Sequence, residues 1–148
     1  MAITESGIYG ATLKKALANT AAIDLLTTSS VKTLMVTDTY TPNFNTHTLA
    51  ADVTNEVSGT GYTAGGAAAS ALALDVSTPA TGQLRYDKND ESWAGSTISN
   101  AMAAIVYNHT AVDGLIYLAD FVTAASTTAG TFSITWATNG LFYIDHAG

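Results

Sequence analysis

A length of 148 residues suits one domain with a hydrophobic core. Hydrophobic residues make up 47% of the chain, whereas charged residues make up only 11%, well below the ~25% of an ordinary soluble domain. The net charge is −7 and no base follows residue 88, so the chain lacks the basic footprint that binding to nucleic acid or to an anionic membrane requires.

Alanine and threonine occupy much of the surface that Lys and Glu usually provide, with 26 and 24 positions respectively. Such side chains lose little conformational entropy on contact. This composition favours a protein that works packed against neighbours. The absence of cysteine excludes disulfides and thiolate metal sites. The segment MAITESGIYG has no signal-peptide pattern, and no apolar run reaches the ~20 residues of a membrane span, so we expect a protein made in soluble form.

The first 30 residues are expected to form an N-terminal helical segment. Tyr9, Leu13, Ala16 and Leu17 have helical spacing, which predicts one amphipathic helix over about residues 9 to 20. Residues 31–38, VKTLMVTD, are rich in β-branched side chains and predict a strand. The next segment, YTPNFNTH, favours turns because proline lacks a donor and asparagine bonds its own backbone.

Strand patterns dominate from residue 70 onward. In ALALDV and QLRYD the apolar side chains alternate, the segment at 96–108 has apolar residues at even spacing, and the apolar run at 114–122 is consistent with a buried strand. The residues expected to share a face within each run are Leu72, Leu74 and Val76; Leu84 and Tyr86; and Ile98, Met102, Ala104 and Val106. Asp113-Gly114 predicts a turn between the last two strands.

Asn139-Gly140 lies between two alternating runs, which is the strongest short signal for a β-hairpin. A two-residue turn there would place Trp136 opposite Tyr143, with Phe132, Ile134 and Trp136 on one face. The last 50 residues therefore predict an antiparallel meander. We expect a mainly β (α+β) fold in a single domain over residues 1–148. It would combine one N-terminal helix with a β-rich body over 31–148, an antiparallel sandwich or barrel-like meander.

The segment NEVSGTGYTAGG, residues 55–66, is the densest in glycine. It fails as a dinucleotide loop because the third glycine of G-x-G-x-x-G would fall at Ala64, and as a phosphate loop because it contains no lysine. The pattern predicts a turn in which glycines supply positive φ angles at little steric cost. Tyr62 would anchor this loop by burying its ring and bonding backbone with its hydroxyl. A stacking platform for ligand bases or sugars is the alternative role for that ring.

Catalytic and metal-binding patterns are weak. The segment DKNDES begins like a calcium loop, but Ser92 and Ile98 replace the required glycine and glutamate, so an acidic turn is the preferred reading and a weak calcium site near Asp87 stays open. His47, His109 and His146 lack the spacing of metal ligands. No nucleophile motif or acid–base pair is recognisable, and we expect neither an enzyme nor a cofactor.

Residues 31–66 resemble a family of small virion proteins of tailed bacteriophages. The family's YTPNF tract, threonine-histidine step, NEV step and GTGYTAGG step all occur. The matching residues are Tyr40, Thr41, Pro42, Asn43, Phe44, Thr46, His47, Asn55, Glu56, Val57, Gly59, Gly61, Tyr62, Gly65 and Gly66. Trp93, the run to AIVYN and the closing GTFSITWATNGLF are similar to later family features. The alanine-rich GGAAASALAL departs from the pattern.

The resemblance implies a structural component of the phage particle, made in the bacterial cytoplasm and located on the capsid surface. The implied function is capsid decoration, in which a homo-oligomer, preferably a trimer, binds the major capsid protein and stabilises the shell. The two loops, Tyr40 to His47 and Asn55 to Gly66, would form its shaped contact region, with Phe44 and Tyr62 as aromatic anchors.

Two other functions stay open at this stage. One is a neck or tail component of the virion. The other is a module that binds carbohydrate or a host surface, for which Trp93, Trp136 and Tyr143 could supply a stacking face.

Overall fold

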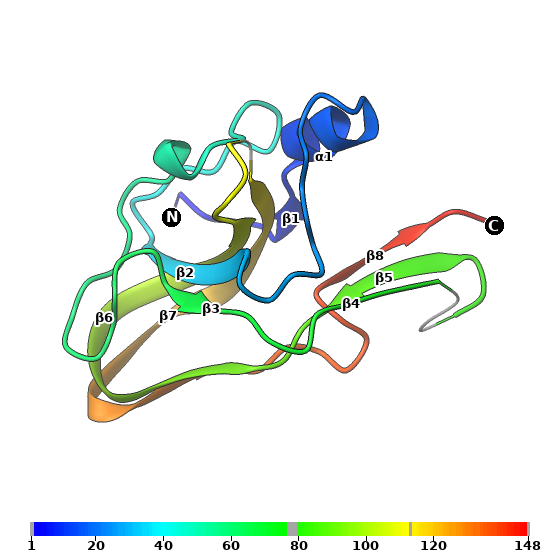
Figure 1. Ribbon diagram of the computed structural model, residues 1–148. Helices are drawn as coiled ribbons and strands as arrows, with labels where there is room; N and C mark the ends of the chain where they lie inside the picture. Colours follow the sequence, from blue (N-terminus) through cyan, green and yellow to red (C-terminus); the bar gives the residue numbers. More distant parts are fainter. Residues whose placement is uncertain (1, 77–79, 113, 148) are drawn as a thin grey trace.

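The computed structural model describes residues 2–76, 80–112 and 114–147, and it consists of two antiparallel sheets and one α-helix (Figure 1). The mainly β, α+β fold class predicted from the sequence is therefore confirmed. In chain order the elements are β1 (Gly7–Ile8), α1 (Gly10–Leu17), β2 (Val31–Thr37), the 3₁₀ turn η1 (Ala50–Asp52), β3 (Ala67–Ala68), β4 (Ala73–Val76), β5 (Gln83–Asp87), β6 (Glu91–Asn108), β7 (Leu115–Ile134) and β8 (Phe142–Asp145).

A five-stranded sheet in the order β1-β7-β6-β2-β3 forms the body of the molecule. Strand β2 lies inside it, and four consecutive side chains from Thr33 to Val36 are buried because both faces of the strand are covered. On one face, Leu34, Val36 and Ile105 pack beneath the N-terminal segment and the loop after β2. On the other, Met35 and Ala104 pack against the outer half of the β6–β7 hairpin.

Helix α1 lies where the sequence predicts it but ends at Leu17 rather than near residue 20. Asn19 adopts a positive φ of 54°, a left-handed conformation that ends helices, which explains the shorter element. The backbone N–H of Ala11 donates to the carbonyl of Phe44 at 3.1 Å, so the loop after β2 satisfies one free donor of the first turn.

Strands β6 and β7 form one long hairpin that bends over the body, as the sequence predicts for their pairing. Several register shifts along the hairpin provide the bend, since bulges increase local twist. Met102 was expected beside Ile98 and Ala104, but it packs on the opposite face of the sheet, because the register shifts between Ala101 and Ala103. Asp113 of the predicted turn lies outside the described residues.

The second sheet, β4-β5-β8, lies to one side of the body, and we call it the wing (Figure 1). Each apolar side chain of β5 lies opposite an apolar side chain of β4 and another of β8, so these residues form two apolar rows across the sheet and one wing face is apolar. The inner row contains Leu74, Tyr86 and Phe142, and the outer row contains Val76, Leu84 and Ile144. The opposite face is polar and is centred on Arg85, which forms ion pairs with Asp75 and Asp87.

The predicted hairpin around Asn139-Gly140 is wrong in its pairing. The turn exists, since the Gly140 N–H donates to the Ala137 carbonyl at 2.9 Å and Gly140 has a φ of 92°. However, the run before the turn pairs with β6, whereas β8 pairs with β5. Phe142 packs beside Tyr86 of β5 and beside Tyr117 near the start of β7, with ring centroids 5.6 Å from each, and not beside the end of β7 that precedes the turn. Trp136 and Tyr143 are therefore not cross-strand neighbours.

Candidate functional site

The glycine-rich loop covers the outer edge of β2. The Val57 N–H donates to the Met35 carbonyl at 2.9 Å, and the Thr37 N–H donates to the Asn55 carbonyl at 3.0 Å. Strand β3 continues this cover along Lys32 and Thr33. A strand edge with unpaired N–H and C=O groups can pair with other chains. The loop occupies these groups along β2 and so protects this edge of the body sheet.

Tyr62 anchors this loop as the sequence predicts. Its ring packs against Trp93, with centroids 6.0 Å apart, and its hydroxyl accepts a hydrogen bond from the Met35 N–H at 3.1 Å. The same hydroxyl donates to Glu56 Oε1 at 2.6 Å, and that oxygen also accepts the Gly65 N–H at 2.6 Å. Burial, with the Glu56 hydrogen bond, raises the pKa of Tyr62 far above its usual value, so the hydroxyl stays a donor.

The predicted positive φ angles occur at all four glycines of the loop: Gly59, Gly61, Gly65 and Gly66. At Gly66 the φ is 74°, and an added Cβ would lie 1.8 Å from the Thr33 carbonyl oxygen. At Gly59 it would lie 1.9 Å from the Thr97 carbonyl oxygen. These glycines therefore allow two close backbone approaches as well as the turns themselves.

The second predicted loop, residues 40–47, lies over the other face of the body sheet. The Tyr40 side chain is buried, and its hydroxyl lies 3.0 Å from both the Tyr9 hydroxyl and His47 Nδ1. Phe44 packs on Tyr9 with ring centroids 5.2 Å apart, and half-buried Pro42 lies between Tyr40 and Phe44 in the chain. Burial raises the pKa of Tyr40.

The structure thus separates the two loops that the sequence grouped as one contact region. Tyr40 and Phe44 belong to the apolar cluster beneath the N-terminal segment, whereas Tyr62 belongs to the cluster under the bent hairpin. Each loop is a well-anchored support for its own face. Asn55, exposed with a φ of 60°, turns the chain at the start of the second loop.

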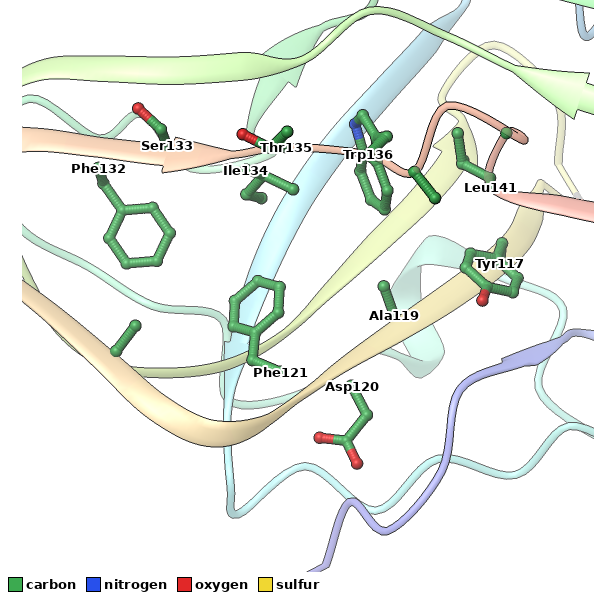
Figure 2. A pocket seen from close by; sticks show the side chains of 13 residues that line it. Tyr117, Ala119, Asp120, Phe121, Phe132, Ser133, Ile134, Thr135, Trp136 and Leu141 are labelled. Carbon is green, nitrogen blue, oxygen red and sulfur yellow. The ribbon is translucent and has the colours of Figure 1, made fainter.

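Sequence reasoning missed a groove of about 360 Å³ between the two halves of β7 (Figure 2). Figure 2 shows Phe121 and Tyr117 on one wall and Phe132 and Trp136 on the other. The signal in the sequence was the presence of several aromatic residues along one strand, namely Tyr117, Phe121 and Phe132, with Trp136 just beyond its end. The bend that turns two parts of that strand toward each other had no sequence signal.

The other chemical candidates do not converge. Among the described residues, no three His, Cys, Asp or Glu side chains lie close enough together to hold a metal ion. In the DKNDES turn, Asp87 pairs with Arg85. Asn89 Oδ1 accepts the backbone N–H of Ser70, and Asp90 Oδ1 accepts the backbone N–H of Trp136. The described chain contains no helix that is long and apolar enough to cross a membrane.

Comparisons with protein-family models, with curated proteins and with solved structures found no match to this chain.

Proposed function

We propose that this protein is a structural component of a phage particle, a capsid decoration protein that binds the major capsid protein as a symmetric homo-oligomer, preferably a trimer. The resemblance of residues 31–66 to small virion proteins supports this proposal, as does a surface with few charges. Both loops of that tract are held by hydrogen bonds and buried aromatic rings, which suits a protein that serves as a rigid component.

The observation that carries the proposal furthest is the apolar face of the wing. In its inner row, Tyr86 and Phe142 pack against the body and Tyr86 donates its hydroxyl to the Leu25 carbonyl at 3.0 Å, whereas Leu74 is 40% exposed. Its outer row extends beyond the body, and the Val76 side chain is 64% exposed. Covering an apolar sheet face of this kind with a partner surface is favourable, because apolar surface is removed from water. In the proposed function that partner is the capsid protein.

Copy number in the particle tests the function directly. Quantitative mass spectrometry of purified virions should give a ratio to the major capsid protein near one or a simple fraction of it, as icosahedral symmetry requires. About ten copies per particle would instead favour the neck or tail alternative, since those parts follow cyclic symmetry. Absence from the particle would overturn the virion proposal.

A pair of variants tests the wing as the contact. Val76→Lys places a charge on the apolar face, whereas Tyr143→Lys places one on the polar face of the same sheet, where Tyr143 is 49% exposed. We expect Val76→Lys to lose binding to undecorated capsids while Tyr143→Lys keeps it, because burying an unpaired charge is costly. Equal binding by both variants would exclude the apolar wing face as the contact.

The aromatic groove favours carbohydrate binding as a second candidate function. Trp93 is buried and Tyr143 lies on the wing, so these two do not form the stacking face that the sequence suggested. The groove of Figure 2 instead brings Trp136 together with Phe121. A glycan array that detects binding by the wild type but not by Phe121→Ala would support this function, and an array without any binding would exclude it.

A further inference from the structure

A buried polar cluster lies at the junction between the body and the wing. Lys88, in the connection from β5 to β6, is 4% exposed, and Glu91, the first residue of β6, is 6% exposed. Thr33 of β2 and Trp136 of the β7–β8 connection complete the cluster. Two opposite charges are thus removed from water together, in a segment to which the proposed function assigns no role.

Each oxygen of the Glu91 carboxyl group has a defined partner. Lys88 Nζ contacts Oε1 directly. The Thr33 hydroxyl donates to the same oxygen at 2.8 Å, and the Trp136 indole N–H donates to Oε2 at 2.8 Å. The Trp136 ring also covers the amine, with Lys88 Nζ 4.9 Å from its centroid. The amine, the carboxyl group and two hydrogen-bond donors are therefore held together in one site.

Burial favours the neutral form of Lys88. Desolvation lowers the pKa of Lys88 to about 7, although the nearby Asp90 and Asp87 oppose the shift. When the ammonium group gives its proton to the Glu91 carboxylate, the products are an amine and a carboxylic acid. A desolvated neutral lysine is a nucleophile.

We propose that Lys88 and Glu91 condense to form an amide bond between their side chains. The Lys88 amine attacks Cδ of the Glu91 carboxylic acid and forms a tetrahedral intermediate. The negative charge develops on Oε2, where the Trp136 N–H stabilises it in the manner of an oxyanion hole. Oε1 then leaves as water, taking one proton from the amine, with the Thr33 hydroxyl hydrogen-bonded to it. One C–N bond forms, one C–O bond breaks and one water is released, with no oxidant or cofactor.

The product would remove a physical cost that the free pair carries. A buried ion pair loses hydration that its mutual attraction only partly offsets. A neutral amide keeps an oxygen for the Trp136 N–H and needs no counter-charge. The bond would also close the β5–β6 connection into a small ring between residues 88 and 91, which fixes one of the links between wing and body.

The mass of the full-length wild-type protein tests the proposal. Under denaturing conditions, we expect the intact protein to be one water lighter than its sequence requires. Trypsin gives a second readout, because Lys88 is the last base in the chain. A free Lys88 permits cleavage into 86–88 and 89–148, whereas the amide leaves a single peptide, 86–148, one water lighter. A full sequence mass together with complete cleavage after Lys88 would overturn the proposal.

Variants assign the roles of the atoms. Lys88→Arg should restore the full sequence mass, whereas the matched Lys32→Arg variant should keep the deficit. Glu91→Gln should release ammonia instead of water and reach the same final mass as the wild type, because the product is identical. Trp136→Phe should form the amide more slowly after synthesis, and an unchanged rate would remove the indole from the oxyanion role. The wild-type mass decides the proposal even where a variant fails to fold.

Discussion

A single methyl group should have very different effects at two glycines that share a backbone conformation. Gly66 and Gly95 have φ angles of 74° and 63°, but an added Cβ meets the Thr33 carbonyl only at Gly66 and has nothing within 4 Å at Gly95. We expect Gly95→Ala to cost about 1–2 kcal/mol from backbone strain alone. Gly66→Ala should cost about 1–3 kcal/mol more because the loop must move off β2.

Thermal melting checks this pair of variants. For a chain of this size, 1 kcal/mol corresponds to about 2–4 °C in Tm. The two variants share the backbone penalty, so the difference between their Tm values reports the close approach at β2. Equal melting temperatures would show that the loop does not press against the β2 backbone.

The Tyr62 hydroxyl gives a second prediction at the scale of one residue. Tyr62→Phe removes the acceptor of the Met35 N–H and one donor to Glu56. Leaving buried polar groups unpaired should lower the free energy of unfolding by about 1–3 kcal/mol. Tyr143→Phe serves as the control because that side chain is half exposed and water can replace its hydrogen bonds. Chemical denaturation of both variants measures the difference, and equal midpoints would contradict the anchor role.

The pairing of β8 with β5 can be tested as an element. At Gly140 an added Cβ would lie 2.6 Å from the Tyr86 carbonyl oxygen and 2.8 Å from Arg85 Cγ, with φ already at 92°. Gly140→Ala should therefore loosen β8 from β5 while the β6–β7 hairpin stays closed. Hydrogen exchange should become faster in Gln83–Asp87 and Phe142–Asp145 only. The exposed neighbour Asn139→Ala should leave exchange unchanged, and uniform acceleration across the sheets would contradict this independence.

Several strands followed from the sequence, namely β2, β4, β5, β8 and much of β6, but β1, β3 and the continuity of β7 did not, and neither did the partners of β8. Alternation identified β4, β5 and β8, because an amphipathic sheet needs apolar residues at every second position. The turn at Asn139-Gly140 could not show that β8 pairs with β5, since Phe142 is drawn to Tyr86 by packing between distant segments. The residues of a turn determine a local bend, whereas tertiary packing determines which strand pairs with the one that follows the turn.

The candidate sites show the same limit. Glycine density and Tyr62 predicted an anchored turn, yet only the fold reveals that the turn covers the edge of β2. The Lys88–Glu91 pair reads as part of an acidic turn because the residues that bury it are remote. Thr33 and Trp136 lie 58 and 45 positions from Glu91 in the sequence.

Assembly is a prediction about the whole molecule. The proposed closed oligomer should appear in sedimentation equilibrium as a species with three times the mass of one chain. A surface with few charges favours such association, because little side-chain entropy is lost in the contact. A mass equal to one chain at every concentration would remove the trimer from the proposal while leaving particle binding to the copy-number test.

The wing is joined to the body by three separate stretches of chain: 69–72, 88–90 and 135–141. Each enters the body through a different strand, namely β3, β6 and β7. A pull on the far end of the wing would therefore be divided among three strands of one hydrogen-bonded sheet. No single connection could act as a hinge, so the wing would move together with the body as one rigid unit and pass the applied force on to it (Figure 1).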